Sequence, residues 1–233
     1  MMVESLDLLA FGAHPDDVEI GMGGTIAKHI SLKKAVGIID LTKAELSSNG
    51  DVVTRQQEAK EASEILGLTV RQSFDIPDRG IEMNHETISL IVDSIRRYRP
   101  SVVFAPYFID RHPDHGHCGR LVEEAVFSAG IRKYKGMQDL PSHKVEALYF
   151  YFINGFHTPS FCVDITQVHE QKMRALSAYK SQFILSEESV ETPLTTDYLE
   201  TVESRDRLFG KEIGTRYAEG FISKKPLVIS SFI

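Results

Sequence analysis

The chain has 233 residues, of which 42% are hydrophobic and 25% charged, as is ordinary for a globular protein. Its 33 acidic residues outnumber the 26 basic ones and give a net charge of −7, which argues against nucleic acid or an anionic membrane as a partner. The length fits one domain, and we expect residues 1–233 to form it.

Several features predict a cytoplasmic location. Cys118 and Cys162 are the only cysteines, too few for a disulfide framework, and two reduced thiols fit the cytosol. No apolar run approaches the roughly 20 residues of a membrane span. The first apolar run, 6–13, has no basic segment before it, so we interpret it as a buried strand and not as a targeting signal.

The hydrophobic pattern predicts strands and helices that alternate along most of the chain. A helix capped by the Thr54 hydroxyl, with Gln57 completing a capping box, is expected to end at Gly67. Further helices are predicted at 19–33, 86–98, 114–129, 166–181 and 196–212, the last followed by a short tail. Strands are predicted at 6–13, 35–41, 69–76, 102–105, 145–153 and 161–165.

This alternation predicts an α/β protein with a Rossmann-like, three-layer fold. Apolar strands separated by helices are typical of a mostly parallel central sheet with helices on both faces. In such sheets, ligands bind at the carboxyl ends of the strands. The less regular stretches 136–159 and 186–197 are candidate loops at the rim of that site.

The first candidate site lies in the phrase Ala13-His14-Pro15-Asp16-Asp17, between the first strand and its helix. A tight turn lets His14 and Asp17 converge on one point, with Asp16 nearby. The alternative is that the aspartates only cap the following helix, since helix N-termini favour aspartate. The phrase alone leaves both interpretations open.

A second phrase, Asp110-Arg111-His112-Pro113-Asp114-His115, lies at the end of a later strand. His115 can supply a third metal ligand beside His14 and Asp17, and two histidines with one carboxylate leave positions open for water and substrate. His112 can then polarise a carbonyl or handle a proton, with Asp114 fixing its tautomer. Asp114 could also be an N-cap. The two phrases together favour a catalytic metal site, for zinc or for ferrous iron.

Three neighbouring features receive simpler interpretations. Cys118 is expected in the core and His117 at the surface. Arg55 alone is best read as a solvated charge. The glycines of Gly21-Met22-Gly23-Gly24 lack dinucleotide-fingerprint spacing, so they are expected to allow close packing of a helix on the sheet. A nucleotide-binding module is therefore the weaker interpretation, as is a metal-binding protein without catalysis.

These phrases resemble the LmbE-like, or PIG-L, family of metal-dependent N-acetylglucosaminyl deacetylases. The resemblance covers most of the chain, because Arg55-x-x-Glu58, Pro77-Asp78 and the stretch from Pro100 to His115 also match family motifs. Leu46-Ser47-Ser48-Asn49-Gly50, Asn154-Gly155-Phe156-His157 and Tyr217-Ala218-Glu219-Gly220-Phe221 look like the bacillithiol-pathway subgroup. Lys43-Ala44 departs from the broader family, in which a glycine often follows the threonine.

The resemblance implies a role for each site residue. His14, Asp17 and His115 would bind the metal, and Asp16 would be the general base. His112, supported by Asp114, would stabilise the oxyanion, and Arg55 would line the pocket near the reacting carbonyl. Relatives form homo-oligomers, so we expect one here.

The subgroup resemblance implies N-acetylglucosaminyl malate as the substrate. Its malate part carries two carboxylates, and Arg111 is the candidate to bind one, although pairing with Asp110 is the simpler alternative. Tyr198 is a further candidate at the rim. A chitooligosaccharide or another N-acetylglucosaminide is the alternative substrate.

Overall fold

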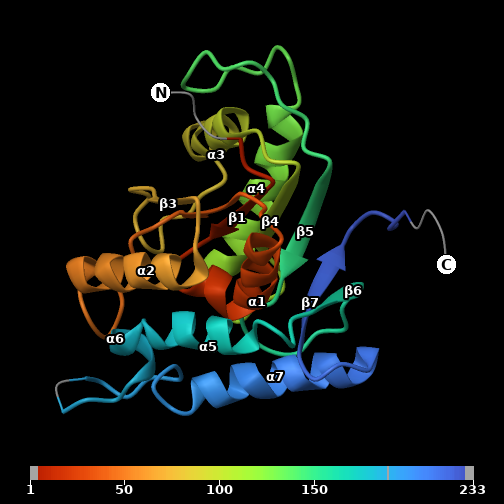
Figure 1. Cartoon of the computed structure of the whole chain (residues 1–233). Coiled ribbons are helices and arrows are strands. Elements are labelled where there is room, and N and C mark those ends of the chain that lie inside the picture. Colours follow the sequence, from red (N-terminus) through yellow and green to blue (C-terminus); the bar gives the residue numbers. More distant parts are fainter. Residues whose placement is uncertain (1–4, 188, 229–233) are drawn as a thin grey trace.

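A seven-stranded sheet lies at the centre of the structure (Figure 1). The computed structural model describes residues 5–187 and 189–228. The strands are β1 (Leu8–Gly12), β2 (Val36–Asp40), β3 (Val70–Ser73), β4 (Val102–Pro106), β5 (Ala147–Tyr151), β6 (Phe161–Asp164) and β7 (Ala218–Ser223). The helices are α1 (Asp17–Ser31), α2 (Val52–Leu66), α3 (His85–Tyr98), α4 (Pro113–Ala129), α5 (His169–Ser177), α6 (Lys180–Phe183) and α7 (Tyr198–Ile213).

The order of the strands confirms the predicted mostly parallel sheet. It is β3-β2-β1-β4-β5-β7-β6, and the first five strands of this order are mutually parallel. Strand β7 runs antiparallel to both β5 and β6. The sequence prediction of a tail after the last helix is wrong here, because residues 218–223 insert as a strand whose first four residues are buried.

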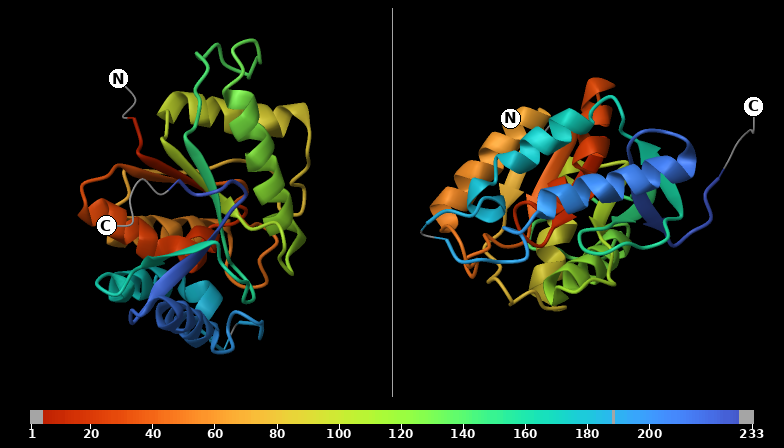
Figure 2. Two further views of the ribbon diagram at one scale, coloured as in Figure 1. Left: turned by 90° about the vertical axis from the view of Figure 1, so that its right-hand side faces the viewer. Right: turned by 90° about the horizontal axis from the view of Figure 1, so that it is seen from below.

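Helices cover both faces of the sheet, so the predicted three-layer architecture is also confirmed (Figure 2). A separate hydrophobic core lies on each face of the sheet, and alternate residues of β1 pack into them. Leu8 and Ala10 lie on one face, and Leu9 and Phe11 on the other. The first face packs against α1, α2 and α5, and the second against α3 and α4. No helix in the described ranges has the length and apolar character that crossing a bilayer requires.

Two predicted helices differ in detail from those observed. Thr54 does not cap α2, because the helix begins at Val52 and the Asp51 carboxylate accepts the Thr54 backbone N–H at 2.7 Å. The helix predicted at 166–181 is two helices, α5 and α6. Tyr179 separates them with a non-helical backbone (φ −81°, ψ 61°), and its buried hydroxyl donates to Glu19 at 2.8 Å.

Most of the predicted rim loop 136–159 lies away from the carboxyl ends of the strands. The buried Arg96 side chain of α3 donates to the backbone carbonyl of Leu140 in this loop, and to those of Ile131 and Tyr134 just before it, and so holds the start of the loop against the helix. His143 bonds to the carbonyl of Pro100, which precedes β4. Only the end of the predicted loop, after β5, lies at the carboxyl ends of the strands, where Ile153 and Asn154 line the cavity.

The glycine cluster of α1 packs closely on the sheet, as predicted. A Cβ atom on Gly21 would lie 2.1 Å from the Tyr151 ring, whose hydroxyl donates to the Phe11 carbonyl at 2.7 Å. We therefore expect Gly21→Ala to lower the free energy of unfolding by about 1–3 kcal/mol, the usual cost of overpacking a core. Chemical denaturation measures this change. Gly130→Ala, where the nearest atom is 3.5 Å away, is the control and should be nearly neutral; equal stability of both variants would contradict the packing argument.

Candidate active site

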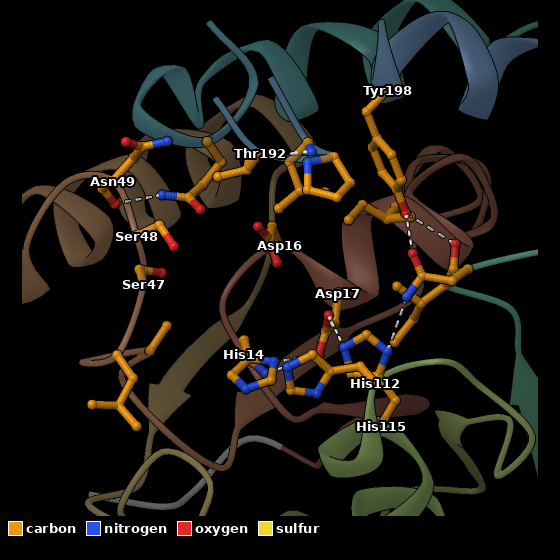
Figure 3. A pocket seen from close by; sticks show the side chains of 18 of the residues that line it. His14, Asp16, Asp17, Ser47, Ser48, Asn49, His112, His115, Thr192 and Tyr198 are labelled. Atoms are coloured by element: carbon orange, nitrogen blue, oxygen red, sulfur yellow. Dashed lines mark hydrogen bonds and ion pairs between the residues drawn. The ribbon is translucent and has the colours of Figure 1, made fainter. Parts of the chain in front are cut away.

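A cavity of about 580 Å³ opens at the carboxyl ends of β1 and β4 (Figure 3). These strands are neighbours in the sheet although two other strands separate them in the chain, and such a reversal of strand order leaves a crevice where ligands bind. The cavity has the size of an ordinary small-molecule site. Both histidine phrases reach it, because one follows β1 and the other follows β4.

The turn after β1 directs three side chains into the cavity. The Asp17 carboxylate accepts the His14 backbone N–H at 2.8 Å and closes the turn. Asp16 occupies the N-cap position of α1 but makes no side-chain cap hydrogen bond, so the capping interpretation of this aspartate is wrong. Its φ of 116° is unusual for a residue with a Cβ atom and costs about 1–3 kcal/mol, a strain found mostly at functional sites.

His14, Asp17 and His115 come together as the sequence predicts. Asp17 Oδ1 lies 3.1 Å from His115 Nε2, and Asp17 Oδ2 lies 3.5 Å from His14 Nδ1. Ligands about 2.0–2.1 Å from a tetrahedral ion are separated from one another by roughly 3.3 Å, and these two contacts, made by the two different oxygens of Asp17, are near that separation. One ring nitrogen from each of His14, His112 and His115 also lies within 4.8 Å of the other two. Figure 3 shows these three rings beside Asp17.

Each of the two candidate ligand histidines has a carboxylate at its other ring nitrogen. His14 Nε2 lies 3.1 Å from Asp78 Oδ1, and His115 Nδ1 lies 3.0 Å from Asp110 Oδ1. Sequence reasoning did not assign Asp78 or Asp110 to the site. Both are carboxylates that follow predicted strands, which is the signal that could have found them.

These carboxylates also set the charge of the histidines. Burial lowers the pKa of His115, but Asp17 and Asp110 outweigh it and raise that pKa to about 9. Burial also lowers the pKa of His14. Its hydrogen bonds to Asp114, Asp17 and Asp78 outweigh this effect and raise that pKa well above its ordinary value. The cluster of acidic groups therefore attracts positive charge strongly, as a cation site requires.

The predicted pairing of the Asp114 side chain with His112 is wrong. One Asp114 oxygen accepts from the Arg79 guanidinium, while the other accepts the Arg79 backbone N–H at 3.0 Å and lies 3.5 Å from His14 Nε2. Asp114 is fully buried at the start of α4, so its carboxylate points toward the turn after β3 instead of back to His112. Asp114 thus supports His14.

The backbone, not a carboxylate, fixes the tautomer of His112. The Asp114 backbone N–H donates to His112 Nδ1 at 3.3 Å, so the proton of the neutral ring is on Nε2. Burial and the neighbouring His115 and His14 lower the pKa of His112, which favours this neutral form. His112 therefore presents an N–H donor at the cavity.

Arg55 holds Asp16 in its strained position. Its Nη1 donates to the Pro15 carbonyl at 2.6 Å and to Asp16 Oδ2 at 3.0 Å, and its Nη2 donates to Ser47 at 2.7 Å. Burial raises the pKa of Asp16 to about 7, although Arg55 opposes this shift. A carboxyl group with such a pKa can both accept and return a proton near neutral pH.

The outer part of the cavity contains the remaining candidates. Arg111 is exposed and lines the cavity, while the nearby Asp110 is engaged with His115 and Asn154 instead. Tyr198 also lines it, and its hydroxyl donates to Asn154 Oδ1 at 3.1 Å. Thr192, Pro193 and Leu194 also line it, so the predicted rim loop 186–197 does reach the cavity. Ser47, Ser48, Asn49 and Gln182, which sequence reasoning did not assign to the site, complete the wall.

His117 and Cys118, which follow His115 on α4, are placed as predicted. Cys118 is fully buried among the core residues of α4, and burial raises its pKa well above the ordinary value of a thiol. His117 is exposed and does not line the cavity. Neither belongs to the donor set.

The fold and the site define a member of the PIG-L family. Residues 9–126 match the family described as GlcNAc-PI de-N-acetylase, and the chain belongs to it. It is 35% identical over 226 residues to the diacetylchitobiose deacetylase of Thermococcus kodakarensis, covering 91% of this chain and 81% of that protein.

Two solved structures are similar over nearly the whole chain. The conserved protein TT1542 from Thermus thermophilus has 38% identity and a TM-score of 0.89, covering 98% of this chain and 99% of that one. The N,N'-diacetylchitobiose deacetylase from Pyrococcus horikoshii, complexed with its inhibitor MPG, has 26% identity and a TM-score of 0.80, and the match covers 92% of this chain and 82% of that one.

Proposed function

We propose that this chain is a metal-dependent deacetylase that hydrolyses the N-acetyl group of an N-acetylglucosaminide and releases acetate and a free amine. The observation that carries the proposal is the convergence of His14, Asp17 and His115 in one cavity, with Asp16 beside them and outside the donor set. Membership of the PIG-L family and similarity to proteins named diacetylchitobiose deacetylases support the same reaction.

His14, Asp17 and His115 would hold the metal, for which we propose zinc, with ferrous iron as the alternative for the same ligands. When bound, a divalent cation supplies Lewis acidity toward the acetamide carbonyl and lowers the pKa of water at the site. The residues beside the donor set carry the proton transfers and stabilise the developing charge.

Asp16 accepts a proton from the attacking water and returns it to the amine as the carbon–nitrogen bond breaks. Arg55 keeps the Asp16 carboxylate in place for both transfers. The Nε2–H of His112 donates to the carbonyl oxygen as negative charge develops on it. Water and amide are consumed, and acetate and amine are produced.

His112→Ala tests the oxyanion role. Removing one such donor costs about 3–4 kcal/mol of barrier, so we expect kcat to fall at least about a hundredfold. Because His112 is outside the proposed ligand set, metal content measured by elemental analysis should stay at the wild-type level. Unchanged turnover, or loss of the metal, would contradict this role.

The finer substrate assignment rests on Arg111 and on the subgroup resemblance. A malate glycoside carries two carboxylates, and an exposed arginine in the cavity wall is suited to bind one of them. We therefore propose N-acetylglucosaminyl malate. The similarity to diacetylchitobiose deacetylases favours a neutral chitooligosaccharide as the second candidate.

Arg111→Ala separates these candidates. A hydrogen bond to a charged group contributes about 1.5–3 kcal/mol, so we expect KM for the malate glycoside to rise roughly ten- to a hundredfold. KM for N-acetylglucosamine should change little. Arg132→Ala, which removes an exposed arginine outside the cavity, is the control. Equal changes in KM for both substrates in Arg111→Ala would contradict a contact between Arg111 and a malate carboxylate.

The proposed function is tested by measuring release of primary amine from N-acetylglucosaminyl malate, diacetylchitobiose and N-acetylglucosamine. Preference for the first supports the malate assignment, and preference for the second supports the chitooligosaccharide alternative. Absence of release from all three with zinc or ferrous iron present would contradict deacetylation.

A further inference from the structure

A buried carboxylate lies directly behind the candidate ligand His115. The Asp110 side chain is only 3% exposed, and its Oδ1 lies 3.0 Å from His115 Nδ1. Both carboxylate oxygens accept further hydrogen bonds. The His112 backbone N–H donates at 2.8 Å, the Asn154 backbone N–H at 3.0 Å and the Asn154 amide Nδ2 at 2.9 Å.

Four nitrogen donors therefore converge on Asp110. Among the ion pairs formed by the described residues, the partner of Asp110 is His115, and none of those pairs joins Asp110 to a lysine or an arginine. A carboxylate in this position accepts a hydrogen bond from the Nδ1–H of the imidazole, which keeps the proton on Nδ1 and leaves the Nε2 lone pair for a ligand. His115 Nε2 is the atom that faces Asp17 across the proposed metal position, at 3.1 Å.

Residues of the cavity wall hold the Asp110 carboxylate in place. Asn154, in the loop after β5, supplies two of its four hydrogen bonds. The Tyr198 hydroxyl, at the start of α7, lies 3.1 Å from Asn154 Oδ1 and 3.2 Å from the Ile153 carbonyl. Tyr198 and Asn154 both line the cavity, so one chain of contacts joins the wall to the candidate ligand.

We infer that Asp110 is a positioning residue for the metal centre and that Asn154 and Tyr198 brace it. Asp110 fixes the tautomer and the orientation of His115, and its negative charge makes His115 a stronger ligand. This inference rests on the proposed metal role of His115. It assigns Asp110 no contact with the substrate.

Metal affinity tests the inference without reference to turnover. In Asp110→Asn, we expect the Kd for Zn²⁺, measured by competition with a chelator, to weaken about 10- to 100-fold, as for other carboxylate partners of metal-bound histidines. The visible absorption spectrum of the Co²⁺-loaded protein should also shift. Asn154→Ala should weaken the Kd less, and Tyr198→Phe least, because each is one contact further from His115.

Asp206→Asn is the matched control. Asp206 is a buried carboxylate that pairs with Lys172 at 2.7 Å and lies 3.4 Å from His169, outside the cavity. Its loss should reduce stability while leaving the Kd for Zn²⁺ at the wild-type value. A purely structural role for Asp110 would make Asp110→Asn behave in the same way, and that result would overturn the inference.

His115→Ala separates failure of this inference from failure of the proposed metal centre. If His115→Ala loses Zn²⁺ but Asp110→Asn binds it as the wild type does, only the positioning role is wrong. If both variants bind Zn²⁺ normally, the metal centre itself is wrong. Should Asp110→Asn fail to fold, Asn154→Ala decides, since a wild-type Kd and Co²⁺ spectrum there would contradict the bracing.

Discussion

Asp16→Asn is expected to lower kcat by a factor of about 10² to 10⁴ while the protein stays folded and keeps its metal. General acid–base catalysis contributes that range, and an amide cannot accept the proton of water. Asparagine tolerates a positive φ about as well as aspartate does, so the turn at φ 116° can persist. Steady-state kinetics and elemental analysis on the same preparation measure the two quantities.

Asp40→Asn is the matched control for this substitution. Asp40 is also fully buried, and burial raises its pKa to about 7, but it does not line the cavity. Its kcat should remain close to the wild-type value. If both variants lost activity equally, the loss would reflect buried charge in general, and Asp16 would not be the base.

His115→Ala is expected to abolish metal binding and to lower kcat/KM at least about a thousandfold. A catalytic cation contributes several kcal/mol of transition-state stabilisation, and each 1.4 kcal/mol corresponds to a factor of ten. The variant removes the donor atom that lies 3.1 Å from Asp17. Zinc content and acetate release measure the effect.

His117→Ala controls for the loss of a histidine on the same helix. His117 is two residues further along α4 and is exposed, outside the cavity. It should retain both the metal and the activity. Retention of stoichiometric zinc by His115→Ala would show that the donor set proposed here is wrong.

Local patterns were enough to predict the layers of the fold and the meeting of the two histidine phrases. Both phrases follow buried parallel strands, and the carboxyl ends of such strands share one edge of the sheet. The glycines at 21–24 indicated close packing, which the contact between Gly21 and Tyr151 explains. Strand β7 was missed because Glu219 and Gly220 interrupt the apolar pattern of its six residues, so no apolar run marked it in the sequence.

The finer contacts depend on side-chain direction, which spacing does not give. Asp114 lies between two histidines in sequence, yet its carboxylate turns to Arg79 and His14. Asp78 and Asp110 follow two different predicted strands, which places them at the same sheet edge, but spacing does not show which histidine each one contacts. The rim loop at 186–197 was predicted from its polar, irregular sequence, but the polar wall at 47–49 was not, because it lies far from both histidine phrases in the chain.

Acetate release by the metal-depleted protein, measured before and after addition of Zn²⁺, tests the central claim most directly. The substrate would be whichever N-acetylglucosaminide the wild-type protein hydrolyses fastest. We predict that chelation removes activity, that one equivalent of Zn²⁺ per chain restores it, and that His115→Ala is not restored. Full acetate release by the metal-depleted protein would contradict the account.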